Sequence, residues 1–229
     1  MSNIAVLSYA LAIHTASPDL GLALSNFAGD DRSQIWAGLG RDSSNYLHSH
    51  LAEFIQPQTW INLAFIAVAK GPGGFTGTRL GVVTARTLAQ QLTIPLFAIS
   101  TLAAVAWGAR SSILPSAVLQ ANPPDIAVQM PAHRGELYTA IYSIRVLPDL
   151  KSDWSDGSTL VTRLPDSVMA IEQWQKTLDS WEDPYHLIQV EGGLGETALN
   201  LLELAYKDWQ QGQRPIWSDA LPFYGQSPV

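Results

Sequence analysis

Residues 67–81 read Ala-Val-Ala-Lys-Gly-Pro-Gly-Gly-Phe-Thr-Gly-Thr-Arg-Leu-Gly, and this stretch decides the fold. It begins inside an apolar segment, 63–69, that has the length and composition of a buried strand. Glycine and proline then make a turn, and the residues after it predict a long amphipathic helix over 76–92. Such a turn leaves backbone N–H groups free for an anion or a partner, although glycine turns also serve simply to reverse the chain.

Two glycine turns are candidate sites for an anion or a nucleotide. The first turn offers Gly71, Gly73, Gly74 and Thr76. The second offers Gly192, Gly193 and Gly195, between a predicted strand and a predicted helix. A residual nucleotide site between two lobes is one interpretation, and two ordinary strand-to-helix turns is the one that we favour.

The composition indicates a globular protein with a large core, and we expect it to need no cofactor. Of 229 residues, 47% are apolar and 14% are charged, and a chain of this length can bury roughly 70% of its unfolded surface. The net charge of −7 argues against a large surface for nucleic acid, because such binding depends on Lys and Arg. The absence of cysteine excludes disulfides and thiolate catalysis, and the five histidines have no metal-ligand spacing.

The apolar run at 4–13 resembles the core of a signal peptide at first sight. No Lys or Arg precedes it, and ten residues are too few to span a bilayer. We therefore expect a cytoplasmic protein with no membrane contact.

The order of predicted elements indicates an α/β protein with two lobes, 1–112 and 113–229, each with a mixed sheet flanked by helices. The first three strands lie close together, as in an antiparallel meander. We expect a surface loop at 148–158 and a C-terminal tail that packs back on the body. The predicted strands are 4–14, 20–27, 32–39, 63–70, 95–99, 117–121, 126–130, 136–146 and 186–190. The predicted helices are 43–56, 76–92, 101–109, 165–176 and 195–210.

The helices at 43–56 and 76–92 each carry an apolar stripe for the core, and apolar residues also lie outside that stripe. Such residues are either scattered surface positions or a face that another helix covers, and the pattern favours neither. The candidate interface residues on the two helices are Tyr46, Leu47, His50, Arg79, Leu80, Val83, Thr84 and Thr87.

Four motifs of the chain resemble those of the TsaB (YeaZ) family, over roughly residues 4–142. The family opening Leu-Ala-Ile-Asp-Thr-Ala/Ser is present as Leu-Ala-Ile-His-Thr-Ala at 11–16. The long central signature Gly-Pro-Gly-Ser-Phe-Thr-Gly-x-Arg-Ile-Gly is present at 71–81 with Gly for Ser and Leu for Ile. A Pro-to-Leu segment ending in Ile-Ser-Thr-Leu occupies 95–102, and Pro-Ala-His-Arg-Gly-Glu-Leu-Tyr at 131–138 resembles Asp-Ala-Arg-x-Gly-Glu-Val-Tyr.

This resemblance implies an actin-like (ASKHA) fold of two related lobes and a non-catalytic role. Members of the family pair with a TsaD-type subunit, which transfers the threonylcarbamoyl group to an adenosine next to the anticodon of tRNA. A TsaE-type ATPase joins the pair, and tRNA is reached only through the complex. The family's pairing surface implies 43–56 and 76–92 as the interface here, and a homodimer when the chain is alone.

Two departures from the family pattern bear on catalysis. His14 stands where the family has Asp, and a neutral imidazole does not replace a carboxylate for Mg²⁺; we expect it to cap a turn or to be packed. Pro131 replaces a second family Asp. His48 and His50 have the wrong spacing for the metal-binding helix of TsaD.

The alternative function, an ATP-dependent kinase-like or hydrolytic (glycoprotease-like) enzyme, rests on the glycine turns. Direct tRNA binding is the weakest hypothesis.

Overall fold

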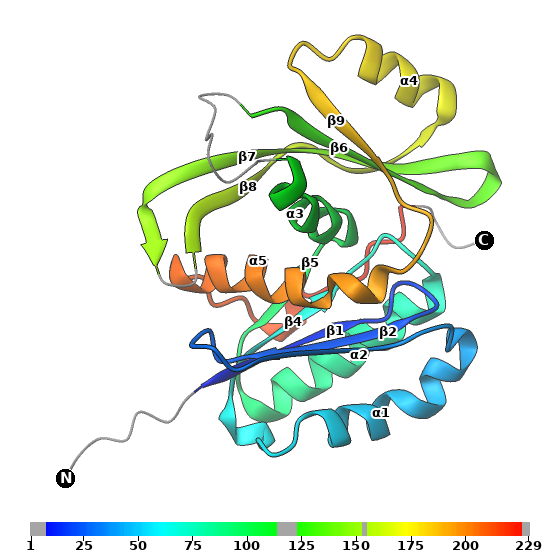
Figure 1. The fold of residues 1–229 in the computed structure, drawn as a ribbon. Helices are drawn as coiled ribbons and strands as arrows, with labels where there is room; N and C mark the ends of the chain where they lie inside the picture. The colour runs from blue at the N-terminus through cyan, green and yellow to red at the C-terminus, as the bar shows by residue number, and fades with distance from the viewer. Residues whose placement is uncertain (1–7, 114–122, 153–154, 226–229) are drawn as a thin grey trace.

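Two β-sheets with helices against both form the described part of the chain, residues 8–113, 123–152 and 155–225, in a computed structural model (Figure 1). The helices are α1 (Ser43–Phe54), α2 (Phe75–Leu92), α3 (Thr101–Ile113), α4 (Ile171–Asp179) and α5 (Ala198–Gln210). Helices α1 and α2 cover the outer face of the first sheet, and α4 covers the outer face of the second. Helices α3 and α5 lie between the sheets.

The first sheet has the strand order β3-β2-β1-β4-β5. Its strands are β1 (Tyr9–His14), β2 (Leu20–Ser25), β3 (Asp31–Trp36), β4 (Leu63–Ala69) and β5 (Leu96–Ile99). The first three strands form the antiparallel meander that the sequence predicts, and β4 and β5 run parallel to β1, so the sheet is mixed. Residues of β1 alternate between the helices on its two faces: Leu11 and Ile13 contact the α1–α2 side, whereas Ala10 and Ala12 face α5.

The second sheet has the order β8-β7-β6-β9. Its strands are β6 (Asp125–Pro131), β7 (Glu136–Ser152), β8 (Ser155–Ala170) and β9 (Tyr185–Gln189). A tight turn joins β6 to β7, with Arg134 at φ 60° and Gly135 at φ 73°. Strand β9 pairs parallel to β6, whereas the other pairs are antiparallel, so this sheet is mixed too.

Two secondary-structure predictions for the second half are wrong. The predicted helix at 165–176 is strand up to Ala170, where β8 pairs with Glu136 at the start of β7, and α4 begins only at Ile171. The predicted loop at 148–158 belongs mostly to β7 and β8, which continue as a long hairpin. In both cases pairing with a partner strand overrides the local helix and turn preferences. The strand predicted at 117–121 lies outside the described residues.

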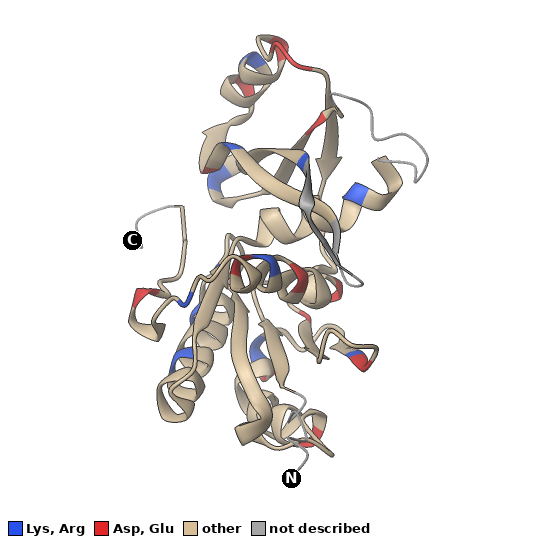
Figure 2. Ribbon diagram, turned by 90° about the vertical axis from the view of Figure 1, so that its left-hand side faces the viewer, with Lys and Arg blue, Asp and Glu red and all other residues tan. Residues whose placement is uncertain are grey.

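In the part of the chain that the structure describes, Lys and Arg lie interspersed with Asp and Glu over both halves (Figure 2). This distribution agrees with the sequence argument against an extended surface of its own for a polyphosphate backbone. Within the described ranges, no helix has the length and apolar character needed to cross a membrane.

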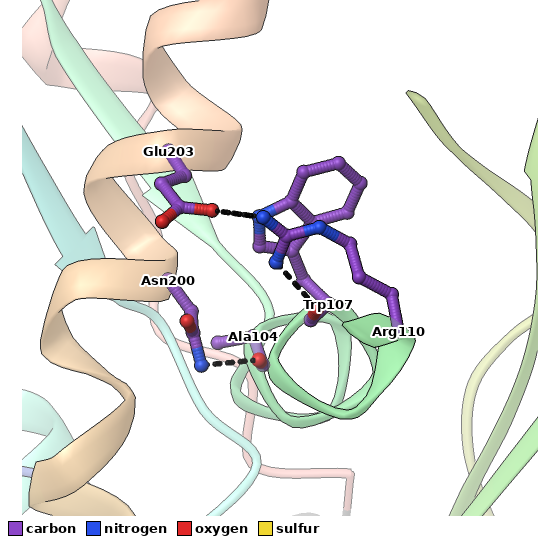
Figure 3. A network of polar contacts seen from close by, with 5 residues as sticks. All are labelled: Ala104, Trp107, Arg110, Asn200 and Glu203. Carbon is purple, nitrogen blue, oxygen red and sulfur yellow. Dashed lines mark hydrogen bonds and ion pairs between the residues drawn. The ribbon is translucent and has the colours of Figure 1, made fainter. Parts of the chain in front are cut away.

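Helices α3 and α5 are joined by a network of polar contacts (Figure 3). The indole Nε1 of buried Trp107 donates to Glu203 Oε2 at 2.5 Å, and Arg110 forms an ion pair with the same oxygen at 2.8 Å. Asn200 Nδ2 donates to the carbonyl oxygen of Ala104 at 3.1 Å. Because α3 packs on the second sheet and α5 on the first, this network ties the two halves together.

The C-terminal segment crosses from the first sheet to the second. The amide of Leu96 on β5 donates to Pro215, and the amide of Phe223 donates to the carbonyl of Lys70 at 2.7 Å. The hydroxyl of Tyr138 on β7 donates to the backbone oxygen of Tyr224 at 3.2 Å. This segment therefore lies against both halves.

Candidate functional site

The first glycine turn packs directly against the β1–β2 connection. The amide of Gly74 donates to the carbonyl of Ala16 at 2.7 Å, and Thr15 Oγ1 donates to the carbonyl of Gly77 at 2.7 Å. A Cβ atom on Gly73 would lie 2.2 Å from the Ala16 oxygen, and one on Gly77 would lie 2.1 Å from the Thr15 oxygen. Only glycine permits this approach, so packing against the chain itself explains the glycines.

The turn also meets the C-terminal segment. Gly71 has φ +98°, and a Cβ atom there would lie 2.4 Å from the Phe223 carbonyl oxygen. Thr76, at the start of α2, is exposed. The carbonyl oxygens that surround this turn carry partial negative charge, which disfavours an anion at the same place.

The second glycine turn packs against the start of β2. A Cβ atom on Gly21 would lie 2.1 Å from the Gly195 oxygen, so β2 and this turn are in close backbone contact. Gly193 has φ +72°, which suits glycine, whereas Gly192 has open space around its Cβ position. Both turns thus have a structural reason that needs no ligand, and a nucleotide site at them stays a prediction.

His14 ends β1 in the position of the family Asp and is fully buried. Neither ring nitrogen has a hydrogen-bond partner among the described residues. Burial lowers the pKa of His14 from 6.5 to about 4, although the Asp19 carboxylate opposes the shift. The imidazole is therefore neutral at physiological pH, which confirms the prediction of a packed histidine. Pro131 is exposed at the end of β6.

The outer surface of α1 and α2 exposes one large apolar side chain on each helix, Tyr46 and Val83, with polar residues four positions away. Tyr46 and Val83 are 49% and 51% exposed, and other apolar residues of the described chain, such as Ile171 at 55%, are exposed to a similar degree. Arg79 and Thr87 are exposed on the same stripe of α2 as Val83. His50 is half-buried and lies next to Tyr46, with ring centroids 6.0 Å apart. We call these five residues the α1–α2 face.

Three of the eight candidate interface residues do not belong to this face, because they are buried or half-buried against the core. Leu47 is fully buried among the core residues between α1 and the first sheet, because it shares a stripe with Leu51. Thr84 is 7% exposed, since it lies beside Ala85 on the side of α2 that meets the sheet. Leu80 is half-buried, because it packs against the core between α2 and the first sheet.

Sequence reasoning missed Trp36 of β3, which packs against His50 of the α1–α2 face. Its ring stacks on His50 with centroids 4.3 Å apart and meets Phe54 edge-on. A single aromatic residue in a polar, exposed strand carries no periodic signal, so only the fold reveals this contact. Among the residues that the structure describes, no group of three or more His, Cys, Asp or Glu is placed to hold a metal ion.

Comparisons with known proteins give sequence matches over part of the chain. The model of the TsaD family, tRNA N6-adenosine threonylcarbamoyltransferase, matches residues 54–150. The tRNA threonylcarbamoyladenosine biosynthesis protein TsaB of Bacillus subtilis (strain 168) is 37% identical over 102 residues, which are 41% of this chain and 40% of that protein. The protein of the same name from Buchnera aphidicola subsp. Schizaphis graminum (strain Sg) is 47% identical over 45 residues, 20% of this chain and 21% of the relative. The matches thus span less than half the length of these curated relatives.

Two solved structures match nearly the whole chain. YeaZ from Pseudomonas aeruginosa has a TM-score of 0.69 at 20% identity, over 95% of this chain and 99% of that one. A protein described as similar to peptidase YEAZ from Pseudomonas aeruginosa has a TM-score of 0.70 at 21% identity, over 96% of this chain and 100% of the other. These likenesses concern the fold, and they confirm the actin-like (ASKHA) architecture with two mixed sheets flanked by helices.

Proposed function

We propose that this chain, which belongs to the TsaB (YeaZ) family, takes part in threonylcarbamoyladenosine synthesis as a non-catalytic subunit that pairs through α1 and α2. The partner is a TsaD-type transferase, joined by a TsaE-type ATPase, and tRNA is bound only through that complex. Alone, the chain pairs with a second copy of itself through the same face. The names of the relatives state threonylcarbamoyladenosine biosynthesis. The scaffold role is our inference.

The observation that carries the proposal is the exposure of Tyr46 and Val83 on the α1–α2 face, which lies on the two helices that the family resemblance assigns to pairing. Its residues recur every four positions on each helix, and such ridges fit the grooves of a facing helix pair. Tyr46 supplies a large ring with a polar end, a residue type enriched in interfaces. Val83 lies in the middle of α2, with Arg79 and Thr87 one turn to either side. A facing helix pair would remove these apolar groups from water.

The non-catalytic part of the proposal is supported by His14. A carboxylate at this place would be a hard ligand for Mg²⁺, whereas a buried neutral imidazole without a hydrogen-bond partner is not. The first glycine turn, on which an ATP-dependent enzyme would rest in part, packs against the chain's own carbonyl oxygens, and the second packs through Gly195 against Gly21 of β2. No contact of the described residues favours that alternative.

The substitution Val83→Glu tests the pairing surface. In a dimer built on α1 and α2, the new carboxylate loses its water without gaining a partner. We expect the homodimer dissociation constant to rise by about a hundredfold, which corresponds to about 2.7 kcal/mol. Light scattering after size exclusion over a concentration series measures the change.

Ile171→Glu is the matched control, because Ile171 is 55% exposed on α4, on the far side of the molecule from α1 (Figure 1). This control should dimerise as the unmodified chain does, and both variants should keep its circular dichroism spectrum. An unchanged dimer in Val83→Glu, or an unfolded chain, contradicts the assignment of Val83 to a partner surface.

A further inference from the structure

A cavity of about 400 Å³ opens where the two halves of the chain meet, beside the edge strand β5. Its walls come from the ends of β4 and β5, the start of α3, strand β8 and the last turns of α5. A second hollow of about 470 Å³ continues it along β5 toward the C-terminal segment and shares Lys70 and Asp208 with it. The polar and charged side chains that line the first cavity include Lys70, Ser100, Tyr142, Asp166, Lys207 and Asp208.

The carboxylate of Asp166 is held in one orientation by two hydroxyl groups. Ser100 Oγ and Tyr142 OH both donate to its Oδ1 atom, at 2.8 Å and 2.9 Å. No hydrogen bond from a described residue reaches Oδ2, although Asp166 lines the cavity. Burial raises the pKa of Asp166, and the hydroxyl bonds and Lys70 oppose the rise. An oriented, partly desolvated acceptor therefore faces the cavity.

Lys70 places a cation in the same cavity without neutralising that carboxylate. It is close enough to lower the pKa of Asp166, yet no described residue forms an ion pair within 4.0 Å of its ammonium. Opposite charges held apart in a partly desolvated space are costly unless a further group joins them. The arrangement is therefore that of a site prepared for a molecule that reaches both.

The opposite wall also carries one lysine and one aspartate. Lys207 of α5 lies over the Trp107 ring at 4.8 Å, and the next residue, Asp208, has its pKa raised by burial. The N-terminus of α3 offers no anion site, because the amide of Thr101 donates to the Gly71 carbonyl and the two following amides donate to Ser100 Oγ. The cation of this cavity that is placed for an anion is therefore Lys70.

We propose that this cavity binds a free amino acid, with the ligand carboxylate toward Lys70 and its ammonium toward Asp166. Lys70 and Asp166 present one charge of each sign, so a ligand with a single charge leaves one of them without a partner. The volume is at the lower end of the range for small-molecule sites, which suits a compact ligand. The site is separate from the α1–α2 face, and it does not depend on the proposed pairing.

Thermal-shift measurements on the full chain with each proteinogenic amino acid, followed by calorimetric titration, test the proposal. We expect at least one amino acid to raise the melting temperature, because a ligand that binds only the folded state stabilises it. Two analogues of that amino acid should fail to bind: the corresponding amine, which lacks the carboxylate, and the corresponding carboxylic acid, which lacks the ammonium. Binding by either one-charge analogue as tightly as by the amino acid, or no binding by any amino acid, overturns the proposal.

Two substitutions locate the binding. Asp166→Asn keeps an Oδ1 acceptor for Ser100 and Tyr142 but removes the charge, so it should weaken binding by about tenfold or more. Lys70→Met should do the same, and it keeps the test valid if Asp166→Asn disturbs the fold. Asp31→Asn and Lys176→Met, both at exposed positions outside the cavity, should bind as the unmodified chain does. Unchanged binding in both cavity variants contradicts the assignment.

Discussion

Acid should destabilise this protein through His14, and the substitution His14→Leu should remove that contribution. The imidazole is fully buried at the end of β1, and no described residue bonds to either ring nitrogen. Its pKa in the folded chain is about 4, against an ordinary value of 6.5 that the unfolded chain regains. The neutral form is therefore the one that the fold accepts. Leucine fills a similar space and takes up no proton.

The magnitude follows from the two pKa values. Above pH 6.5 the side chain is neutral in both states, so it adds no pH dependence. Between pH 6.5 and about 4 only the unfolded chain binds the proton, and the free energy of unfolding falls as the pH falls. At about 1.36 kcal/mol for each pH unit, the loss is about 2 kcal/mol at pH 5 and approaches about 3 kcal/mol below pH 4.

Urea unfolding followed by tryptophan fluorescence at a series of pH values between 7.5 and about 5 measures this loss. The quantity of interest is the difference between the unmodified chain and His14→Leu, because acids such as Asp166 titrate in both and cancel. His133→Leu, at an exposed position in the β6–β7 turn, should behave as the unmodified chain. Parallel curves for the unmodified chain and His14→Leu would refute the reasoning.

Two further predictions concern packing and the joint between α3 and α5. Gly77→Ala places a Cβ atom 2.1 Å from the Thr15 oxygen and should lower the free energy of unfolding by about 2–4 kcal/mol, whereas Gly192→Ala, with open space, should change it by less than about 0.5 kcal/mol. Equal effects in urea unfolding would contradict the packing role of the central glycines. Glu203→Leu leaves the buried indole N–H of Trp107 without its acceptor and should cost about 1–3 kcal/mol, while Glu203→Gln retains an acceptor and should cost less. Similar losses for the two would argue against that hydrogen bond.

The first half of the fold could be predicted from the sequence because its signals are local. Short apolar strands alternate with long amphipathic helices, and Pro57 and Pro95 follow the ends of α1 and α2. The Ser100 cap of α3 was also predictable, and its Oγ accepts from two amides of the first turn, at 3.1 Å and 3.2 Å. The buried stripes followed from the helical period alone.

In the second half, β6, β9 and α5 were predicted, but the long hairpin of β7 and β8 and the cavity were not, since both depend on contacts between distant residues. The pattern from Pro165 onward suits a helix start, but pairing of β8 with β7 holds that segment as strand up to Ala170. Asp166 lies in this misassigned stretch, and its partners Ser100 and Tyr142 are 66 and 24 positions away. The close backbone approach of Gly77 to Thr15 likewise has no local signal, so spacing alone suggested an anion turn.

The most direct test of the proposed scaffold role is light scattering after size exclusion on this chain, alone and mixed with a TsaD-type protein from the same source. The account predicts a homodimer alone, which converts to a one-to-one heterodimer in the mixture, and predicts that Val83→Glu weakens both. A monomer that elutes unchanged in the presence of that protein would contradict it.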